Sequence, residues 1–283
     1  MTPEAPGRHR VLVVIPTYQE AGTIRTAVAG ARAALPDADV LVVDDNSPDG
    51  TGDIADELAV IDPQVQVLHR PGKQGLGAAY KAAFAWALER NVDVVVQMDS
   101  DGSHDPADLP RLVAALGDVH GITDGGADLV LGSRWVPGGA VRDWPAWRRG
   151  LSMGGNLYVR LVLRLPVRDA TGGYRAFRVG VLRATPLEEV SSAGYCFQVD
   201  LVLRAVQAGF RVREIPIVFR ERTVGESKMS RAIVREALGR VTWWALTNRR
   251  ASLRGTQVDP DGTTQGAGAL YRRDSPSSAE SGS

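Results

Sequence analysis

Residues 92–106, VDVVVQMDSDGSHDP, contain the pattern that decides the fold. The apolar, β-branched run from Val92 to Val96 predicts a buried strand. Acidic and small residues then interrupt the pattern, and Asp105 followed by Pro106 is typical of the N-cap and first turn of a helix. The stretch therefore predicts a strand, a polar turn and a helix in that order, which is the repeating unit of an α/β sheet.

The same unit occurs three times before this stretch. Short apolar runs are found at Val11 to Ile15, Val40 to Val43 and Val65 to Leu68. Alanine-rich segments with helical spacing of apolar residues lie between the runs, at Thr23 to Leu35, Thr51 to Val60 and Gly77 to Glu89. The order βαβαβαβ predicts a parallel sheet with helices on both faces.

The second half of the chain has a less regular pattern. We predict a fifth strand from Leu129 to Leu131 and a further strand from Val212 to Ile217. We predict helices at Gly155 to Leu165, at Phe197 to Ala208, and from Arg231 to about Leu246 with Ser230 as its N-cap.

Composition indicates one globular domain with short extensions. The chain has 283 residues, of which 44% are hydrophobic. We expect an N-terminal arm at residues 1–9, one α/β domain at residues 10–250, and a tail at residues 251–283 whose Gly, Ser and Pro content predicts disorder.

Charge and cysteine content narrow the classes of partner and compartment. The 33 basic and 33 acidic residues balance, so no global field attracts nucleic acid, and none is expected as a partner. The single cysteine, Cys196, excludes an internal disulfide and fits a reducing compartment. Since no apolar leader and no uncharged run of about 20 residues is present, we expect a cytoplasmic protein without a spanning segment.

Acidic residues follow the fourth predicted strand at the edge where such sheets bind ligands. In an extended backbone, the side chains of Asp99 and Asp101 project to the same side and can face one cation. Carboxylate oxygens suit Mg²⁺ or Mn²⁺. The alternative is that these acids only shape a turn before Gly102, but their place between a strand and a helix favours the metal.

Two further loops at this edge suit a nucleotide. Asp44 and Asp45 follow the second strand, where acids accept hydrogen bonds from a base or ribose, although the same residues could form only a turn. Residues 70–77, RPGKQGLG, suit phosphate but lack the spacing of a Walker loop or a dinucleotide fingerprint, and Lys73 could equally be a surface charge.

Six motifs together resemble one family in order and spacing. They are VVIPTYQE (13–20), VVDDNSPDGT (42–51), RPGKQGLGAAY (70–80), QMDSDGSH (97–104), VLGSRW (130–135) and FRERTVGESK (219–228). Over about residues 10–248 the chain resembles the dolichol- or polyprenol-phosphate mannose synthases of glycosyltransferase family 2. That resemblance implies a GT-A fold, which is Rossmann-like.

The resemblance also implies roles for individual residues. Metal binding falls to Asp99 and Asp101, with Ser103 at a position where some relatives have glutamine. The donor nucleotide pocket would contain Pro16, Thr17, Tyr18, Glu20, Asp44, Asp45, Lys73 and Ser100. The acceptor and its phosphate would contact Arg134, Arg149, Gln198, Asp200, Arg222 and Lys228, and catalysis would depend on Asp99, Asp101, Arg134, Arg222 and Lys228.

The implied reaction is inverting transfer of mannose from GDP-mannose to polyprenyl phosphate, with Mg²⁺ or Mn²⁺. A phosphate monoester has a second pKa of about 6, so it is already anionic and needs no catalytic base. The lipid acceptor implies peripheral binding to the cytoplasmic face of a membrane, and a separate membrane-anchoring protein is a further expected partner. Two alternatives remain open, namely a polyprenyl-phosphate glucose synthase using a UDP-sugar and a non-catalytic nucleotide-binding module.

Overall fold

The computed structural model describes residues 9–117, 126–191, 194–221 and 238–247. The predicted arm up to residue 8, the predicted tail at residues 251–283 and the predicted N-cap Ser230 lie outside these ranges. In the described ranges, no helix combines the length and the hydropathy that crossing a membrane requires.

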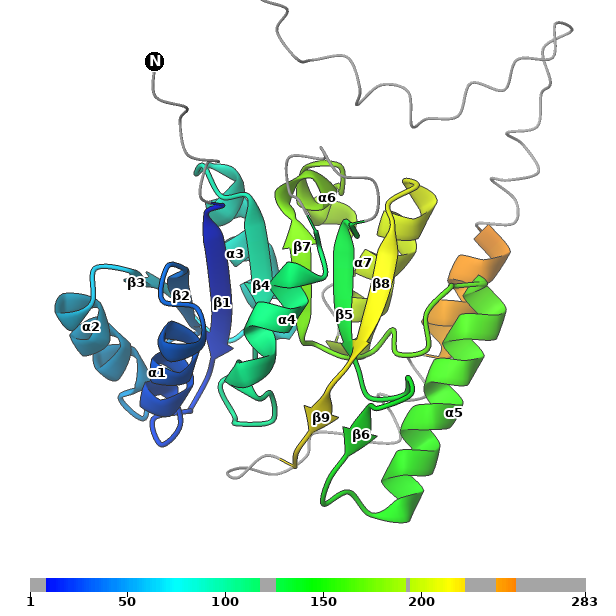
Figure 1. The fold of residues 1–283 in the computed structure, drawn as a ribbon, viewed down its shortest axis with the longest axis horizontal. Coiled ribbons are helices and arrows are strands. Elements are labelled where there is room, and N and C mark those ends of the chain that lie inside the picture. The colour runs from blue at the N-terminus through cyan, green and yellow to red at the C-terminus, as the bar shows by residue number, and fades with distance from the viewer. Residues whose placement is uncertain (1–8, 118–125, 192–193, 222–237, 248–283) are drawn as a thin grey trace, which may run out of the picture.

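A seven-stranded sheet in the order β3-β2-β1-β4-β7-β5-β8 forms the centre of the molecule (Figure 1). Its strands are β1 Val11–Thr17, β2 Asp39–Asp44, β3 Val65–His69, β4 Val94–Gln97, β5 Leu129–Ser133, β7 Arg175–Arg178 and β8 Val212–Pro216. All neighbouring pairs are parallel except those of β7, which is antiparallel to both β4 and β5. The carboxyl ends of the six parallel strands therefore share one edge.

Helices cover both faces of the sheet, as the strand pattern predicts (Figure 1). One face packs against α1 Ile24–Ala34, α2 Thr51–Ile61 and α4 Leu109–Ala114. The other packs against α3 Leu76–Leu88, α5 Ala146–Leu163, α6 Val179–Arg183 and α7 Gly194–Gln207. The described elements also include two 3₁₀ turns, Pro106–Asp108 and Leu187–Glu189, a small pair of strands, β6 Ala140–Val141 and β9 Val218–Phe219, and the helical residues 238–247.

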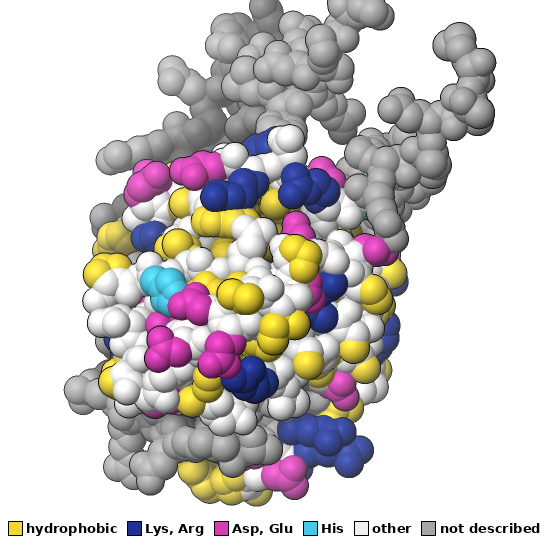
Figure 2. Space-filling model, turned by 90° about the vertical axis from the view of Figure 1, so that its left-hand side faces the viewer, with side chains coloured by type: hydrophobic (Ala, Val, Ile, Leu, Met, Phe, Trp, Pro, Cys, Tyr) yellow, Lys and Arg dark blue, Asp and Glu magenta, His cyan; other side chains and the backbone are white. Residues whose placement is uncertain are grey.

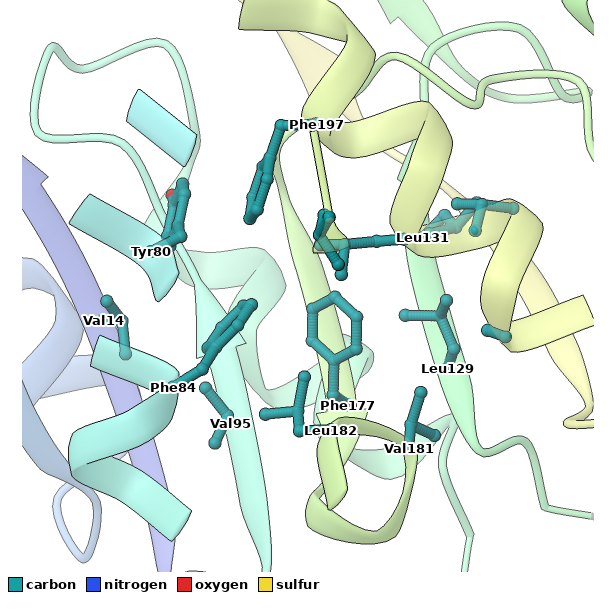
Figure 3. Packing of buried hydrophobic residues seen from close by; sticks show 14 of the residues in the cluster. Val14, Tyr80, Phe84, Val95, Leu129, Leu131, Phe177, Val181, Leu182 and Phe197 are labelled. Carbon is teal, nitrogen blue, oxygen red and sulfur yellow. The ribbon is translucent and has the colours of Figure 1, made fainter. Parts of the chain in front are cut away.

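Alternation along each strand divides the core into two layers. On β1, Leu12 and Val14 pack toward α3, whereas Val13 and Ile15 pack toward α1. Strands that are apolar at every position can only be stable with both faces buried. Aromatic rings dominate the α3 layer, where Phe84 meets Phe177 edge to face with ring centroids 5.7 Å apart (Figure 3).

The predicted elements of the first half are confirmed with small shifts of their ends. Asp105 is the predicted N-cap, because its Oδ1 accepts a hydrogen bond from the Ala107 N–H at 3.0 Å, and the 3₁₀ turn that follows leads into α4. In the second half, α5 begins at Ala146 rather than at Gly155. The three glycines at positions 150, 154 and 155 lower helix propensity and hide its first turns from sequence analysis.

The antiparallel strand β7 was not predicted. It has four residues, Arg-Ala-Phe-Arg, with a charged residue at each end and no β-branched side chain. It inserts between β4 and β5 and brings Arg175 into the interior.

Arg175 is fully buried and holds three segments together through its guanidinium. Its Nε donates to the Gly172 carbonyl at 2.8 Å and its Nη2 to the Ala170 carbonyl at 2.7 Å. Its Nη1 donates to the carbonyl of Gln198 on α7 at 2.7 Å. Burial lowers the pKa of Arg175 to about 9, which still leaves the group charged at neutral pH. The loop before β7 and the first turns of α7 are thereby fixed to one strand.

We predict that Arg175→Met destabilises the fold. The substitution removes the three hydrogen bonds that the guanidinium donates to the carbonyls of Ala170, Gly172 and Gln198, and a hydrogen bond from a charged donor contributes about 1.5–3 kcal/mol. The free energy of unfolding, measured by urea denaturation followed by circular dichroism, should fall by at least about 3 kcal/mol. Arg183→Met, which changes an exposed arginine, is the matched control and should stay near wild type. Equal stability of both variants would contradict the assigned role of Arg175.

Candidate active site

The loops that follow β1, β2 and β4 are joined at the carboxyl edge of the sheet. Thr17 and Asp44 are register partners on β1 and β2. The Asp45 N–H donates to the Thr17 carbonyl at 3.2 Å, and the Ser100 hydroxyl lies 3.5 Å from the Pro16 carbonyl. The structure thus brings together the predicted nucleotide loops and the predicted metal loop.

The Asp99 to His104 loop is closed by its own hydrogen bonds. The backbone N–H of Asp99 donates to His104 Nδ1 at 3.0 Å, and the backbone N–H of Ser103 donates to Asp101 Oδ1 at 3.1 Å. Tyr80 on α3 donates its hydroxyl to Asp99 Oδ1 at 3.4 Å. The side chain of Asp99 is 30% exposed, whereas Asp101 is buried, so one carboxylate opens toward solvent and the other lies beneath it.

Burial sets the protonation of the groups around this loop. It lowers the pKa of His104, which keeps the ring neutral and lets Nδ1 accept the Asp99 N–H. It raises the pKa of Tyr80 well above its usual value, so the phenol remains a donor to Asp99. The His104 ring also stacks on Tyr174 with centroids 4.5 Å apart. The loop is therefore held by hydrogen bonds with neutral groups.

The residues present fit a divalent cation that is shared with a substrate. In the described ranges no group of three or more His, Cys, Asp and Glu side chains is placed to hold a metal alone. Mg²⁺ is commonly held by one or two carboxylates together with substrate phosphates and water. Asp99 and Asp101 match that pattern. The Ser103 hydroxyl is buried without a hydrogen-bond partner among the described residues, which suits the additional ligand position expected there.

The predicted donor pocket contains a buried ion pair. Asp45 and Arg70 pair through Arg70 Nη1, and both side chains are buried. Burial raises the pKa of Asp45 despite the nearby Arg70 guanidinium. Arg70 was not among the predicted site residues, although its position directly after β3 was the available signal. Asp44 instead accepts from the N–H and hydroxyl of Ser47, so it shapes its own loop.

The remaining donor residues lie where β1 leads into α1. The ammonium of Lys73 lies 3.9 Å from the ring centroid of Tyr18, which connects the loop after β3 to the loop after β1. The Glu20 N–H donates to the Thr51 hydroxyl oxygen at 2.9 Å, and the Glu20 carboxylate accepts from the Thr23 hydroxyl at 3.1 Å. Lys73 is thus held beside Tyr18, and Glu20 is held at the start of α2.

Arg134 is buried in an ion pair rather than open to solvent. Its Nε and Nη2 each donate to Asp169 at 2.7 Å, and its backbone N–H donates to the same carboxylate at 3.0 Å. Burial alone would raise the pKa of Asp169, but the Arg134 guanidinium outweighs it and holds the pKa below its usual range. Asp169 was not predicted from the sequence, because an acid before Ala-Thr-Gly-Gly resembles an ordinary turn.

Aromatic rings surround the Arg134 guanidinium. Its Cζ lies 5.4 Å from the ring centroid of Phe219 and 5.6 Å from that of Trp144. Arg148, which is buried, stacks on the same Trp144 at 4.1 Å and pairs with Glu221. The predicted Arg149 is exposed, so the structure brings Arg148 rather than Arg149 to this cluster.

The two predicted polar residues of α7 differ in their surroundings. Gln198 is buried beside the metal loop. Asp200 is also buried, but its carboxylate accepts from the Ser191 N–H at 2.8 Å and from Arg204 Nε at 2.9 Å. Asp200 therefore anchors α7 to the preceding segment and does not share the surroundings of Gln198. Arg222 and Lys228 lie outside the described residues.

Comparisons with known proteins agree with this arrangement. The family model described as glycosyl transferase family 2 matches residues 12–185. An undecaprenyl-phosphate mannosyltransferase of Micrococcus luteus is 52% identical over 245 residues, covering 87% of this chain and 98% of that protein. A polyprenol monophosphomannose synthase of Mycolicibacterium smegmatis is 51% identical over 248 residues, covering 87% of this chain and 91% of that protein.

Solved structures share the fold at low sequence identity. Glucosyl-3-phosphoglycerate synthase of Mycobacterium tuberculosis, with Mn²⁺, UDP and its product, has a TM-score of 0.58 at 20% identity and covers 85% of this chain and 80% of its own. A mannosyltransferase of Pyrobaculum calidifontis in complex with GDP-Man and Mn²⁺ has a TM-score of 0.52 at 19% identity. The match covers 94% of this chain and 79% of that protein. The fold is GT-A, and the chain belongs to glycosyltransferase family 2.

Proposed function

We propose that this protein transfers mannose from GDP-mannose to the phosphate of a polyprenyl phosphate, with inversion at the anomeric carbon. The observation that carries the proposal is the loop of Asp99 and Asp101, which lies at the same sheet edge as the buried ion pair of Asp45 and Arg70. The names of the relatives from Micrococcus luteus and Mycolicibacterium smegmatis support mannose and a polyprenyl phosphate. The mannosyltransferase structure with GDP-Man supports the donor.

Two groups of residues at this edge would bind different parts of the donor. Asp45, Tyr18 and Lys73 would hold the nucleoside, since they supply acceptors, an aromatic ring and a cation around one pocket. Asp99 and Asp101 would hold a Mg²⁺ or Mn²⁺ ion on the diphosphate. When bound, that ion supplies Lewis acidity, which stabilises the negative charge on the departing GDP. Tyr80 and His104 position the Asp99 carboxylate for this contact.

The acceptor phosphate would attack without help from a base, because it arrives as an anion. His104 is consistent with a reaction that needs no base. Its ring is neutral, and its Nδ1 already accepts a hydrogen bond from the Asp99 backbone N–H. The repulsion between two anionic substrates has to be offset by cations. We assign this role to Arg134 and Arg148, and Arg149, Arg222 and Lys228 remain proposed contributors.

The lipid tail of the acceptor requires contact with a membrane, and one surface suits it. On α5, the side chains of Trp147, Leu151, Met153, Leu157 and Leu161 are exposed. The helical residues 238–247 lie alongside, since Tyr158 and Thr242 share a hydrogen bond of 2.6 Å, and they expose Leu238, Trp243 and Leu246 (Figure 1). We call these eight residues the α5 apolar face.

Charge distribution distinguishes the α5 apolar face from other surfaces. Residues 146–163 and 238–247 contain arginines but no Asp or Glu. By contrast, the face over α1, α2 and β3 mixes acidic, basic and apolar side chains (Figure 2). Apolar and aromatic residues flanked only by cations suit an anionic membrane surface. We propose that this face binds the cytoplasmic side of the membrane, with or without an anchoring protein.

A donor screen with active-site variants tests the proposed reaction. Purified full-length chain with Mn²⁺ and a short polyprenyl phosphate should consume GDP-mannose and not UDP-glucose. Asp99→Asn and Asp101→Asn should each lower turnover by at least about a hundredfold and remove the Mn²⁺ dependence of GDP binding, because each loses a charged oxygen ligand. Asp37→Asn, at an exposed position before β2, is the control. Full turnover in either site variant would refute the metal assignment, and preference for UDP-glucose would refute the donor.

The geometry of the Arg134 pair gives a second test. Arg134→Lys keeps the charge, but one ammonium cannot span both oxygens of Asp169 as the guanidinium does. We expect kcat/KM for polyprenyl phosphate to fall by at least about tenfold, which corresponds to about 1.4 kcal/mol. Arg213→Lys, at an exposed position on β8, should leave it unchanged. If Arg134→Lys retained wild-type kinetics, charge alone would suffice and the fixed orientation would be irrelevant.

Vesicle binding tests the α5 apolar face. The double variant Leu157→Asp with Leu161→Asp places two acids in that face and should abolish co-sedimentation with vesicles of phosphatidylglycerol and phosphatidylcholine in equal amounts. Activity on a short acceptor dissolved in detergent should remain. Ile61→Asp, which changes an exposed apolar residue on α2, should bind vesicles like wild type. Unchanged binding of the double variant would exclude this face as the membrane contact.

A further inference from the structure

Gln198 on α7 is a buried amide whose hydrogen-bonding groups are unused. The residue is 3% exposed, and neither its Nε2 nor its Oε1 has a hydrogen-bond partner among the described residues. Leaving such an amide unpaired in the interior costs free energy, because it gives up water without gaining a protein partner. A buried group of this kind calls for a ligand that pairs with it.

The amide borders the same small volume as the metal loop. A Cβ atom added at Gly173 would lie 3.7 Å from Gln198 Nε2, from Asp99 Oδ2 and from His104 Cε1 alike. Three side chains from α7 and from the loop after β4 therefore surround one point next to Gly173. Glycine leaves that point open, and any larger residue would extend into it.

The position of Gln198 relative to Asp99 is fixed from two sides. Its backbone carbonyl accepts from the fully buried Arg175 at 2.7 Å. The adjacent Phe197 stacks on Tyr80 with ring centroids 5.9 Å apart, and Tyr80 donates to Asp99 (Figure 3). The amide is thus held rigidly at the metal loop, although its own polar atoms take no part in holding it.

The chemistry of the amide selects among the groups that could occupy this volume. A phosphate oxygen only accepts, so it would satisfy Nε2 and leave Oε1 unpaired. A sugar hydroxyl both donates and accepts, so adjacent hydroxyls can satisfy both ends of the amide. Under the proposed function, on which this step rests, Asp99 holds the diphosphate to which the donor sugar is attached.

We infer that Gln198 binds hydroxyl groups of the sugar that is transferred, and that it contributes to the choice of that sugar. This assigns Gln198 to the donor sugar rather than to the acceptor phosphate, where the family resemblance had placed it. A site built to hydrogen-bond a substrate hydroxyl discriminates strongly against a substrate that lacks it.

Calorimetry on the full-length chain with Mn²⁺ tests the inference, with GDP and GDP-mannose as separate ligands. Gln198→Met keeps the length of the side chain and removes both polar atoms. We expect it to weaken GDP-mannose binding by about tenfold and to leave GDP binding within about twofold. Its melting temperature without ligand should stay the same or rise, because a buried unpaired amide is removed. Gln207→Met, at the exposed end of the same helix, is the control and should bind both ligands like wild type.

Several outcomes would overturn the inference. Equal weakening of GDP and GDP-mannose, or a lower melting temperature without a sugar-dependent loss, would show that the amide supports the fold. Unchanged donor affinity with impaired acceptor kinetics would return Gln198 to the acceptor side. If wild type instead binds UDP-glucose, the same comparison is made with UDP and UDP-glucose. In that case GDP-mannose is refuted as the donor, but the comparison still tests whether Gln198 binds the donor sugar.

Discussion

The buried guanidinium of Arg175 is the interaction on which the arrangement of the site depends. It binds the carbonyls of Ala170 and Gly172 in the loop before β7, and the carbonyl of Gln198 on α7. That loop carries Asp169, which orients Arg134, and it ends at Gly173, which lies against Asp99. One side chain therefore sets the distance between the cation that would handle phosphate and the carboxylate that would hold the metal. Arg175 reaches this position because the antiparallel strand β7 lies between β4 and β5.

Neutral and unpaired groups gather around the two carboxylates, and this has an energetic consequence. His104 and Tyr80 are kept uncharged by burial, so they orient Asp99 without neutralising it. The Ser103 hydroxyl and the Gln198 amide are buried without partners in the described part of the chain. Each unpaired group destabilises the ligand-free protein, and each becomes favourable when a ligand pairs with it. We interpret these unpaired groups as binding groups for the nucleotide sugar. They make the ligand-free protein less stable, which is common at functional sites.

Much of the fold was predictable because it depends on local patterns. Continuous apolar runs identify β1 to β4, and Asp45, Asp99 and Asp101 lie at one edge of the sheet, as the edge rule for parallel sheets predicts. The antiparallel β7 was not predictable, since four residues with arginine at both ends carry no strand signal. Contacts between residues that lie far apart in the sequence could not be predicted either. Nothing in the sequence indicates that Asp169 rather than solvent surrounds Arg134, or that Arg148 rather than its neighbour Arg149 is buried. Such contacts depend on tertiary packing, which no short window of sequence records.

In the proposed reaction, this edge of the sheet joins a sugar to a phosphate by a single displacement. Nuclear magnetic resonance of the product formed from GDP-mannose and a short polyprenyl phosphate tests it most directly, with the matching polyprenol as a second acceptor. We expect a mannosyl phosphodiester whose anomeric configuration is inverted relative to the donor, and no product from the alcohol. Retention of configuration, release of free mannose alone, or efficient mannosylation of the alcohol would contradict it.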